Sequence, residues 1–244
     1  MIDFTKFKIE IYTNRKTPIV IDNQNLFYIK DDGIDELFVK IYYDGVEIGQ
    51  GIVLDFYKEF INIESNGQAS TQIKTFPFHG STKDKYTNYG NKIYQLKYLK
   101  NPPISQTQRD IYINEFTNNI NLYIPQLLEL NQNLKLSYIP SSSLLPDDIA
   151  KQLSDISLLE VANIISKSSG FDSKNITNFE EGIKHSFVKY NIDEDFLRIN
   201  PNVQFIIIDD VMGNGSSMAT VLKKIYDKTQ KLNYFFIVAK DVKR

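Results

Sequence analysis

The chain of 244 residues is 42% hydrophobic and carries 28 basic and 30 acidic side chains, a formal net charge of −2. This composition suffices for one large or two small packed domains and excludes a disordered chain. The near-neutral charge provides no global field that would attract nucleic acid or an anionic membrane. The absence of cysteine excludes disulfides, thiol catalysis and zinc ribbons, and two histidines do not suffice for a structural metal site.

The amino terminus lacks the pattern of a signal peptide, and no apolar run approaches the ~20 residues that a membrane-spanning helix needs. We therefore expect a cytoplasmic protein without a membrane partner. The charge balance also argues against nucleic acid as a partner, although a local basic patch is compatible with it.

Residues 1–84 predict a small β-rich domain with a connector. Apolar or alternating runs predict strands at Phe7 to Tyr12, Ile19 to Ile21, Leu26 to Ile29, Phe38 to Tyr43 and Val46 to Ile52. The pair Asp44-Gly45 between the last two runs predicts a hairpin. The stretch from Asn66 to Asn88, rich in Gly, Ser and Thr, predicts a connector loop, with a domain boundary near Lys83.

From residue 85 to 244 the pattern changes to alternating helices and strands. Helical spacing predicts helices at Tyr89 to Leu99, Ile113 to Tyr123, Pro146 to Ser166 and Met218 to Thr229; apolar runs predict strands at Leu134 to Pro140, Val203 to Ile208 and Tyr234 to Ala239. Pro125 would redirect the second helix, and Gly170 is placed to end the third. This order predicts an α/β domain with a doubly wound, mainly parallel sheet.

The most informative stretch runs from Phe205 to Met218. Its first residues are apolar without polar alternation, which is typical of a parallel strand covered on both faces. Asp209 and Asp210 follow, and a glycine-rich turn then leads into a helix. Ligands of open α/β sheets bind at the carboxyl ends of the strands, beside a helix amino terminus.

Spacing distinguishes the glycine-rich turns that bind phosphates. A Walker loop needs a lysine after its last glycine, where this chain has Ser216, and a dinucleotide-binding turn needs a third glycine, where it has Met218. A sugar-phosphate site remains, with Asp209 and Asp210 for ribose hydroxyls. The phosphate would be bound by Gly213, Asn214, Gly215, Ser216 and Ser217. An ordinary helix start capped by Asp210 or Asn214 stays open as an alternative.

These residues resemble the signature of the type I phosphoribosyltransferases: four apolar residues, two acids, two apolar residues and a Thr-Thr-Gly turn with a final hydroxyl. Gly213 and Asn214 stand where the family has its two threonines. The resemblance implies that Asp209 and Asp210 are catalytic residues that accept hydrogen bonds from the 2′- and 3′-hydroxyls of phosphoribosyl pyrophosphate. It also implies that the turn holds the 5′-phosphate.

Two further segments resemble the ComF-like branch of that family. Tyr89 to Tyr98 is similar to the segment that opens the phosphoribosyltransferase domain, and Leu136 to Ser142 is similar to the strand and loop that hold pyrophosphate. The similarity covers about two thirds of the chain, from Tyr86 onward. ComF proteins usually carry an amino-terminal zinc ribbon, which the β-rich segment replaces here.

Other candidate ligand-binding residues lie outside the signature. Ser141, Ser142 and Ser143 form a candidate pyrophosphate loop, and an ordinary solvent-exposed turn is equally compatible with them. No basic residue follows them before Lys151. Lys97 either neutralises pyrophosphate or points to solvent. His185 either acts as an acid or base near the site or is a hydrogen-bonded structural residue.

We therefore expect a phosphoribosyltransferase that binds phosphoribosyl pyrophosphate and transfers the phosphoribosyl group to an unidentified nucleophile. The expected cofactor is Mg²⁺, held mainly through oxygens of the ligand rather than by a protein cage. One alternative is a non-catalytic ribose-phosphate sensor whose residues 1–84 contact a partner protein. Another is a ComF-like, DNA-associated factor.

Overall fold

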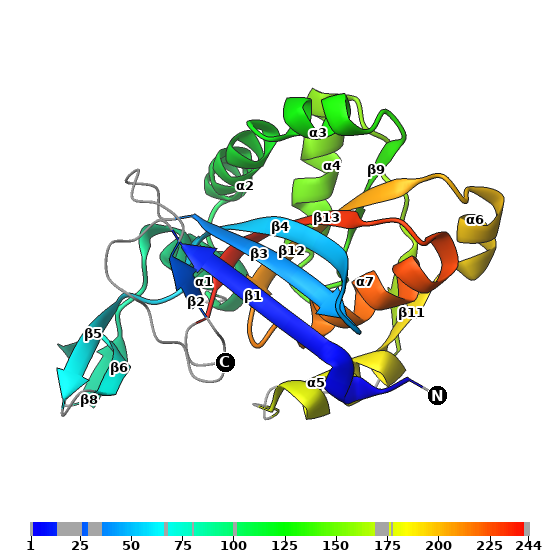
Figure 1. Ribbon diagram of the computed structural model, residues 1–244. Helices are drawn as coiled ribbons and strands as arrows, with labels where there is room; N and C mark the ends of the chain where they lie inside the picture. Colours follow the sequence, from blue (N-terminus) through cyan, green and yellow to red (C-terminus); the bar gives the residue numbers. More distant parts are fainter. Residues whose placement is uncertain are drawn as a thin grey trace.

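The computed structural model describes residues 2–13, 26–28, 36–65, 68–79, 81–99, 102–168, 176 and 178–241. The strand predicted at Ile19 to Ile21 and the helix end predicted at Gly170 lie outside these residues. The described chain forms an α/β fold around a seven-stranded sheet (Figure 1).

The sheet has the strand order β2-β1-β3-β4-β13-β12-β9. Its strands are β1 (Phe7–Thr13), β2 (Leu26–Tyr28), β3 (Leu37–Tyr43), β4 (Val46–Phe56), β9 (Leu134–Tyr138), β12 (Gln204–Met212) and β13 (Asn233–Lys240). Neighbours from β4 to β9 run parallel, as do β1 and β2, whereas β3 runs antiparallel to both β1 and β4. The sheet is therefore mixed and mostly parallel, which is compatible with the predicted doubly wound arrangement.

The helices are α1 (Asn88–Tyr98), α2 (Gln106–Asn121), α3 (Ile124–Leu130), α4 (Leu145–Ser157), α5 (Phe179–Lys189), α6 (Glu194–Ile199) and α7 (Ser216–Thr229). α1 and α7 confirm two predicted helices, and α3 begins where Pro125 was expected to redirect the chain. Within the described residues, no helix combines the length and the apolar composition that crossing a membrane requires.

Two hydrophobic cores form on the two faces of the sheet. Along β12, Phe205 and Ile207 pack with residues of α5 and α7, whereas Ile206 and Ile208 pack with residues of α1 to α4. All four side chains are fully buried, which confirms that this strand is covered on both faces. In Figure 1, α2, α3 and α4 lie above the sheet and α5 and α7 below it.

The amino-terminal strands continue the same sheet. The predicted hairpin is confirmed: β3 and β4 pair around Asp44 and Gly45, which both have a positive φ, of 51° and 78°. β4 then pairs in parallel with β13, so strands on the two sides of the boundary expected near Lys83 are hydrogen-bonded to each other. This pairing covers an edge of β13 that would otherwise be exposed.

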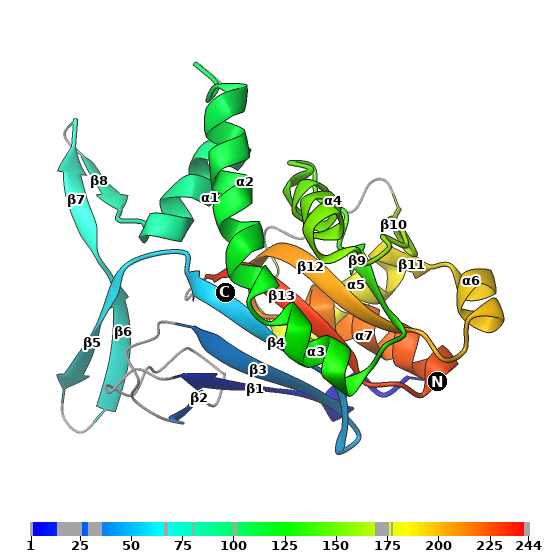
Figure 2. The same cartoon turned by 90° about the horizontal axis from the view of Figure 1, so that it is seen from above.

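The connector loop predicted between Asn66 and Asn88 is wrong, because most of this stretch forms strands. β5 (Phe60–Ser65) pairs with β6 (Gln68–Ile73), and β7 (Thr75–Phe78) pairs with β8 (Ser81–Asp84). Figure 2 shows these two hairpins extending beyond the sheet. The residues of β7 are exposed, as are most residues of β8. Phe76 and Phe78 alternate over four residues only, and Pro77 between them argues against a strand, so the sequence pattern did not reveal this hairpin.

The third predicted helix is shorter than expected, since α4 ends at Ser157 instead of continuing to Ser166. Leu158 adopts a left-handed conformation with φ of 60°, and its N–H bonds to the Ser154 carbonyl. The chain then runs along β9, where the N–H of Leu136 donates to the Glu160 carbonyl at 2.9 Å. Hydrogen bonding to the edge of β9 thus determines the structure of the segment after Ser157, although its apolar residues have helical spacing. The short strands β10 (Ile165–Lys167) and β11 (Tyr190–Ile192) pair beyond it.

Gly90→Ala should destabilise the fold, although alanine usually stabilises a helix relative to glycine by ~0.5–1 kcal/mol. A Cβ on Gly90 would lie 1.7 Å from the Tyr57 carbonyl oxygen, so α1 would have to move away from the end of β4. We expect a loss of about 1–3 kcal/mol in chemical denaturation. Asn91→Ala, at an exposed position of the same turn, is the control and should keep wild-type stability. A Gly90→Ala variant as stable as this control contradicts the close approach.

Candidate functional site

Two adjacent carboxylates lie near the carboxyl end of β12 and are both buried, Asp209 with 9% and Asp210 with 4% of its surface exposed. Successive side chains of a strand point to opposite faces. Asp209 lines a cavity of about 160 Å³ beside α7, which we call the loop cavity. Asp210 lines a second cavity, of about 410 Å³ and bordered by α1, which we call the tyrosine cavity. One carboxylate thus faces each cavity.

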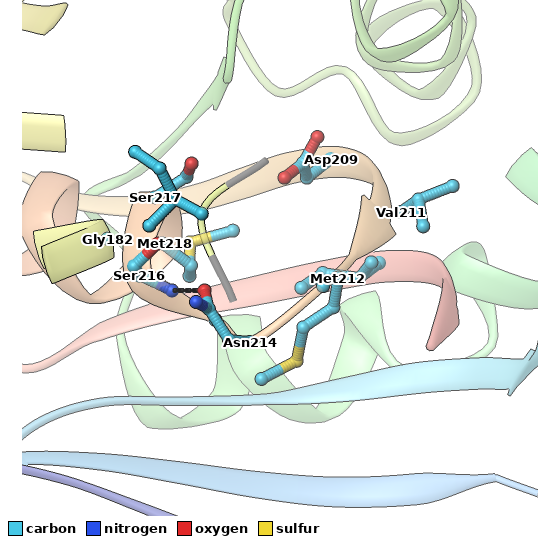
Figure 3. A pocket seen from close by; sticks show the side chains of 12 residues that line it. Gly182, Asp209, Val211, Met212, Asn214, Ser216, Ser217 and Met218 are labelled. Atoms are coloured by element: carbon cyan, nitrogen blue, oxygen red, sulfur yellow. Dashed lines mark hydrogen bonds between the residues drawn. The ribbon is translucent and has the colours of Figure 1, made fainter. Parts of the chain in front are cut away.

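The loop cavity is formed mainly by the turn between β12 and α7 (Figure 3). Its lining residues are Ile176, Gly182, Asp209, Val211, Met212, Gly213, Asn214, Gly215, Ser216, Ser217, Met218 and Ile237. Its volume corresponds to roughly five waters at ~30 Å³ each, which is room for a phosphate group. All the phosphate-binding residues predicted in the turn, from Gly213 to Ser217, therefore border one cavity.

Asn214 connects this turn to two helices. Its Oδ1 accepts a hydrogen bond from the N–H of Ser216 at 3.1 Å, drawn in Figure 3, and its Nδ2 donates to the Asn178 carbonyl at 3.4 Å. The N-cap of α7 is Gly215, and Asn214, one residue before it, accepts from the first N–H of the helix, which is close to the capping role that the sequence left open. A phosphate at this helix terminus would compete with Asn214 for the N–H of Ser216.

A buried lysine and a close helix contact support the turn from behind. Lys240 is fully buried, and its Nζ donates to the carbonyls of Gly213 and Asp241, both at 2.7 Å. Burial lowers the pKa of this ammonium to about 7, while the charge of Asp241 opposes the shift. On the other side, a Cβ on Gly182 of α5 would lie 2.7 Å from the Ser216 Oγ. The turn is therefore held between β13 and α5.

Asp210 forms an ion pair with Lys97. Its Oδ2 accepts hydrogen bonds from Lys97 Nζ at 2.8 Å, from Ser141 Oγ at 3.1 Å and from Ser143 Oγ at 3.2 Å. Burial lowers the pKa of Lys97, but the charge and hydrogen bond of Asp210, with smaller contributions from Tyr98 and Asp209, together raise it by more, so that the pKa lies above its usual value. The pair joins the last turn of α1, the end of β12 and the serine loop (residues 141–143).

Asp209 is stabilised differently. Burial raises its pKa to about 8, and the negative charge of Asp210 raises it as well. The N–H of Asp210, which donates to Asp209 Oδ1 at 2.8 Å, and the charges of Lys97 and Lys189 lower it. The surroundings of Asp209 therefore favour its protonated form, in which it can donate as well as accept a hydrogen bond.

The fold brings two cations to the serine loop, which has no basic neighbour in the sequence. One is Lys97. The other is Arg109 of α2, whose Nη2 donates to the Ser143 carbonyl at 3.3 Å and also pairs with Asp148. Sequence reasoning missed Arg109 because its position depends on how α2 packs against α4.

The tyrosine cavity is lined by four aromatic rings that the sequence did not single out. Tyr57, Tyr86, Tyr94 and Tyr98 form a continuous row, with successive ring centroids 5.2, 5.0 and 5.7 Å apart. The remaining lining residues are Lys58, Lys97, Asp210, Val211, Gly213 and Asp241. The spacing of Tyr94 and Tyr98 on one helical face was the only local signal for this row.

The other predicted site residues are less involved. Ser142 is exposed in the serine loop. His185 lies on α5 and is not among the residues that line either cavity. Over the described ranges, no group of three or more His, Cys, Asp or Glu side chains could hold a metal ion. The oxygens of Asp209, Asp210 and the serines are of the type that Mg²⁺ prefers, but they would need oxygens of a ligand to complete its coordination.

No protein-family model matches this chain, and no curated protein is significantly similar to it. The function must therefore be inferred from the two cavities, the carboxylates between them and the cations around them.

Asp209→Asn should change how stability depends on pH. The carboxyl has a pKa of about 4 in an unfolded chain and about 8 in the fold. Between these values the folded chain holds a proton that the unfolded chain releases, so wild-type stability falls as pH rises. We expect the variant to lose this dependence and to melt above wild type at about pH 8, with a smaller difference at about pH 5, in thermal unfolding.

Asp210→Asn is the matched variant for the same measurement and should shift in the opposite direction. It leaves the largely buried Lys97 ammonium without its carboxylate, which we expect to cost about 1–3 kcal/mol. If both variants shift alike across the pH range, the two carboxylates do not differ in the way their surroundings indicate.

Proposed function

We propose that this chain is a phosphoribosyltransferase-like protein that binds phosphoribosyl pyrophosphate with Mg²⁺ and transfers the phosphoribosyl group to an unidentified nucleophile. The observation that carries the proposal is the placement of two buried carboxylates between a phosphate-sized cavity and a serine loop with two cations. A sugar with a phosphate at one end and a pyrophosphate at the other has the matching order of groups.

Each part of the ligand has a corresponding part of the site. The turn from Gly213 to Ser217, at the positive end of α7, would bind the 5′-phosphate. Asp209 and Asp210 would accept hydrogen bonds from the ribose hydroxyls. The serine loop, Lys97 and Arg109 would bind pyrophosphate through hydroxyls and charge.

Transfer breaks the bond between C1 of the ribose and a pyrophosphate oxygen, and its electron pair leaves with pyrophosphate. A lone pair of the nucleophile forms the new bond to C1. Positive charge develops on the sugar in between, and the carboxylate of Asp210 beside the ring would stabilise it. Mg²⁺ bound to pyrophosphate and ribose oxygens would neutralise charge on the leaving group.

The nucleophile would enter through the tyrosine cavity. This cavity and the loop cavity share Val211 and Gly213, so a sugar held at the turn would present one side to it. Its four rings offer apolar faces and hydroxyls, which suit an acceptor that is both flat and polar. This arrangement favours transfer over binding alone.

Calorimetric titration with phosphoribosyl pyrophosphate and Mg²⁺ tests the proposed binding. We expect saturable binding by wild type and a loss of about tenfold or more for Asp209→Asn and for Asp210→Asn, because each replaces a carboxyl oxygen of the site with an amide nitrogen that cannot accept a hydrogen bond from the ribose. Asp195→Asn, with a carboxylate that is 82% exposed on α6, should bind as wild type does. Neither heat nor a thermal shift with wild type, or unchanged binding by both site variants, contradicts the proposal.

A sensor without turnover is the second candidate, and the contact between Asn214 and Ser216 favours it. Asn214 occupies an N–H that a phosphate would use, and it replaces a hydroxyl of the family signature. Binding tolerates such losses better than catalysis does. The β7 hairpin, where Phe76 and Phe78 are 41% and 39% exposed, would then contact a partner protein.

Release of pyrophosphate distinguishes the two candidates. Incubation of wild type with phosphoribosyl pyrophosphate, Mg²⁺ and a panel of bases and amines should release pyrophosphate above the protein-free rate with at least one acceptor. Asp210→Asn should reduce that release by at least about tenfold, because it removes charge stabilisation at C1. Binding without release by wild type across the panel supports the sensor.

A further inference from the structure

Lys97 holds one of the two site carboxylates in the ligand-free protein. Its ammonium lies 2.8 Å from Asp210 Oδ2, and the same oxygen accepts hydrogen bonds from Ser141 and Ser143. The side chains are only 16% and 6% exposed, so little water competes for either partner. Asp210 Oδ2 is therefore not available to a sugar hydroxyl unless Lys97 is drawn away from it.

Removing Lys97 from Asp210 requires a replacement anion. A largely buried ammonium without a counter-charge is strongly unfavourable, whereas an incoming oxyanion would take the place of the carboxylate as its counter-charge. Lys97 and Asp210 both line the tyrosine cavity. Ser141 of the serine loop donates a hydrogen bond to the same Asp210 oxygen that Lys97 contacts. An oxyanion that enters at the serine loop would therefore meet the ammonium directly.

The other cation of the loop is not placed to do this. Arg109 is bound to Asp148 and to the Ser143 carbonyl, and it reaches the serine loop from the α2 side. It can attract an anion to the loop, but its bonds do not involve Asp210. The link between anion binding and the site carboxylate thus goes through Lys97.

We infer that Lys97 determines which ribose phosphates the site accepts. A ligand with a pyrophosphate on C1 draws Lys97 from Asp210 and frees that carboxylate for its own hydroxyls. A ribose with a 5′-phosphate alone leaves the pair intact and binds weakly. The inference rests on the proposed function and adds a specificity-determining residue to it. An anion bound at the serine loop would draw Lys97 away and make Asp210 available to the sugar.

Lys97→Met tests this with a charge-free side chain of similar length. In calorimetry with Mg²⁺, we expect the variant to bind phosphoribosyl pyrophosphate about tenfold more weakly and ribose 5-phosphate about tenfold more tightly than wild type. The preference for the pyrophosphate ligand should therefore fall by about a hundredfold. Lys92→Met is the matched control, because Lys92 lies on the same helix and pairs with Glu115 outside both cavities. It should keep the wild-type preference.

A wild-type measurement covers the case in which Lys97→Met does not fold. Inorganic pyrophosphate with Mg²⁺ should tighten the binding of ribose 5-phosphate by about tenfold, and the reverse coupling must be equal. Independent binding of the two ligands overturns the inference, as does an unchanged preference in a folded Lys97→Met variant. In both cases wild type still binds phosphoribosyl pyrophosphate, so the proposed function survives. If wild type binds neither sugar ligand, both fail.

Discussion

The site depends on the removal of two adjacent carboxylates from water at the end of one strand. Neighbouring side chains on a strand point to opposite faces, so the free-energy cost of removing each carboxylate from water has to be offset by a different set of groups. For Asp210 this cost is offset by a lysine and two hydroxyls. For Asp209 it is offset by a backbone N–H and by a raised pKa, which favours the neutral form. The surroundings of the strand differ accordingly. Beside Asp210, α1 ends at the ion pair and the serine loop follows β9. Beside Asp209, residues of α5 and α7 line the loop cavity.

Sequence reasoning succeeded where local pattern and burial coincide. The apolar run of β12, the turn after it and α7 were predicted because the strand is covered on both faces and the helix has one apolar side. The same rule was misleading after Ser157, where apolar residues at helical spacing instead run along the edge of β9. The pattern of burial gave no prediction for β7 and β8, because their described side chains are largely exposed.

What the sequence could not predict depends on contacts between distant segments. β4 and β13 pair although they lie far apart in the sequence, with Asn233 opposite Gly49, and no local pattern specifies such a register. The predicted site residues Asp210 and Ser141 meet because parallel strands end at one edge of the sheet, which topology rules anticipate. Lys97 and Arg109 reach them from helices whose packing decides which lysine or arginine of many faces the site.

A plain helix start accounts for only part of this arrangement. Such a start needs one side chain that accepts an N–H of the first turn, and Asn214 supplies it from the position before the N-cap. It gives no reason for two buried carboxylates, a lysine removed from water beside one of them and a second lysine buried under the turn. Buried ion pairs add little stability compared with apolar side chains of the same size, and a carboxyl with a raised pKa reduces stability at neutral pH. Groups that weaken a fold and gather around two neighbouring cavities support the proposed binding of a ligand with complementary charges and hydroxyls.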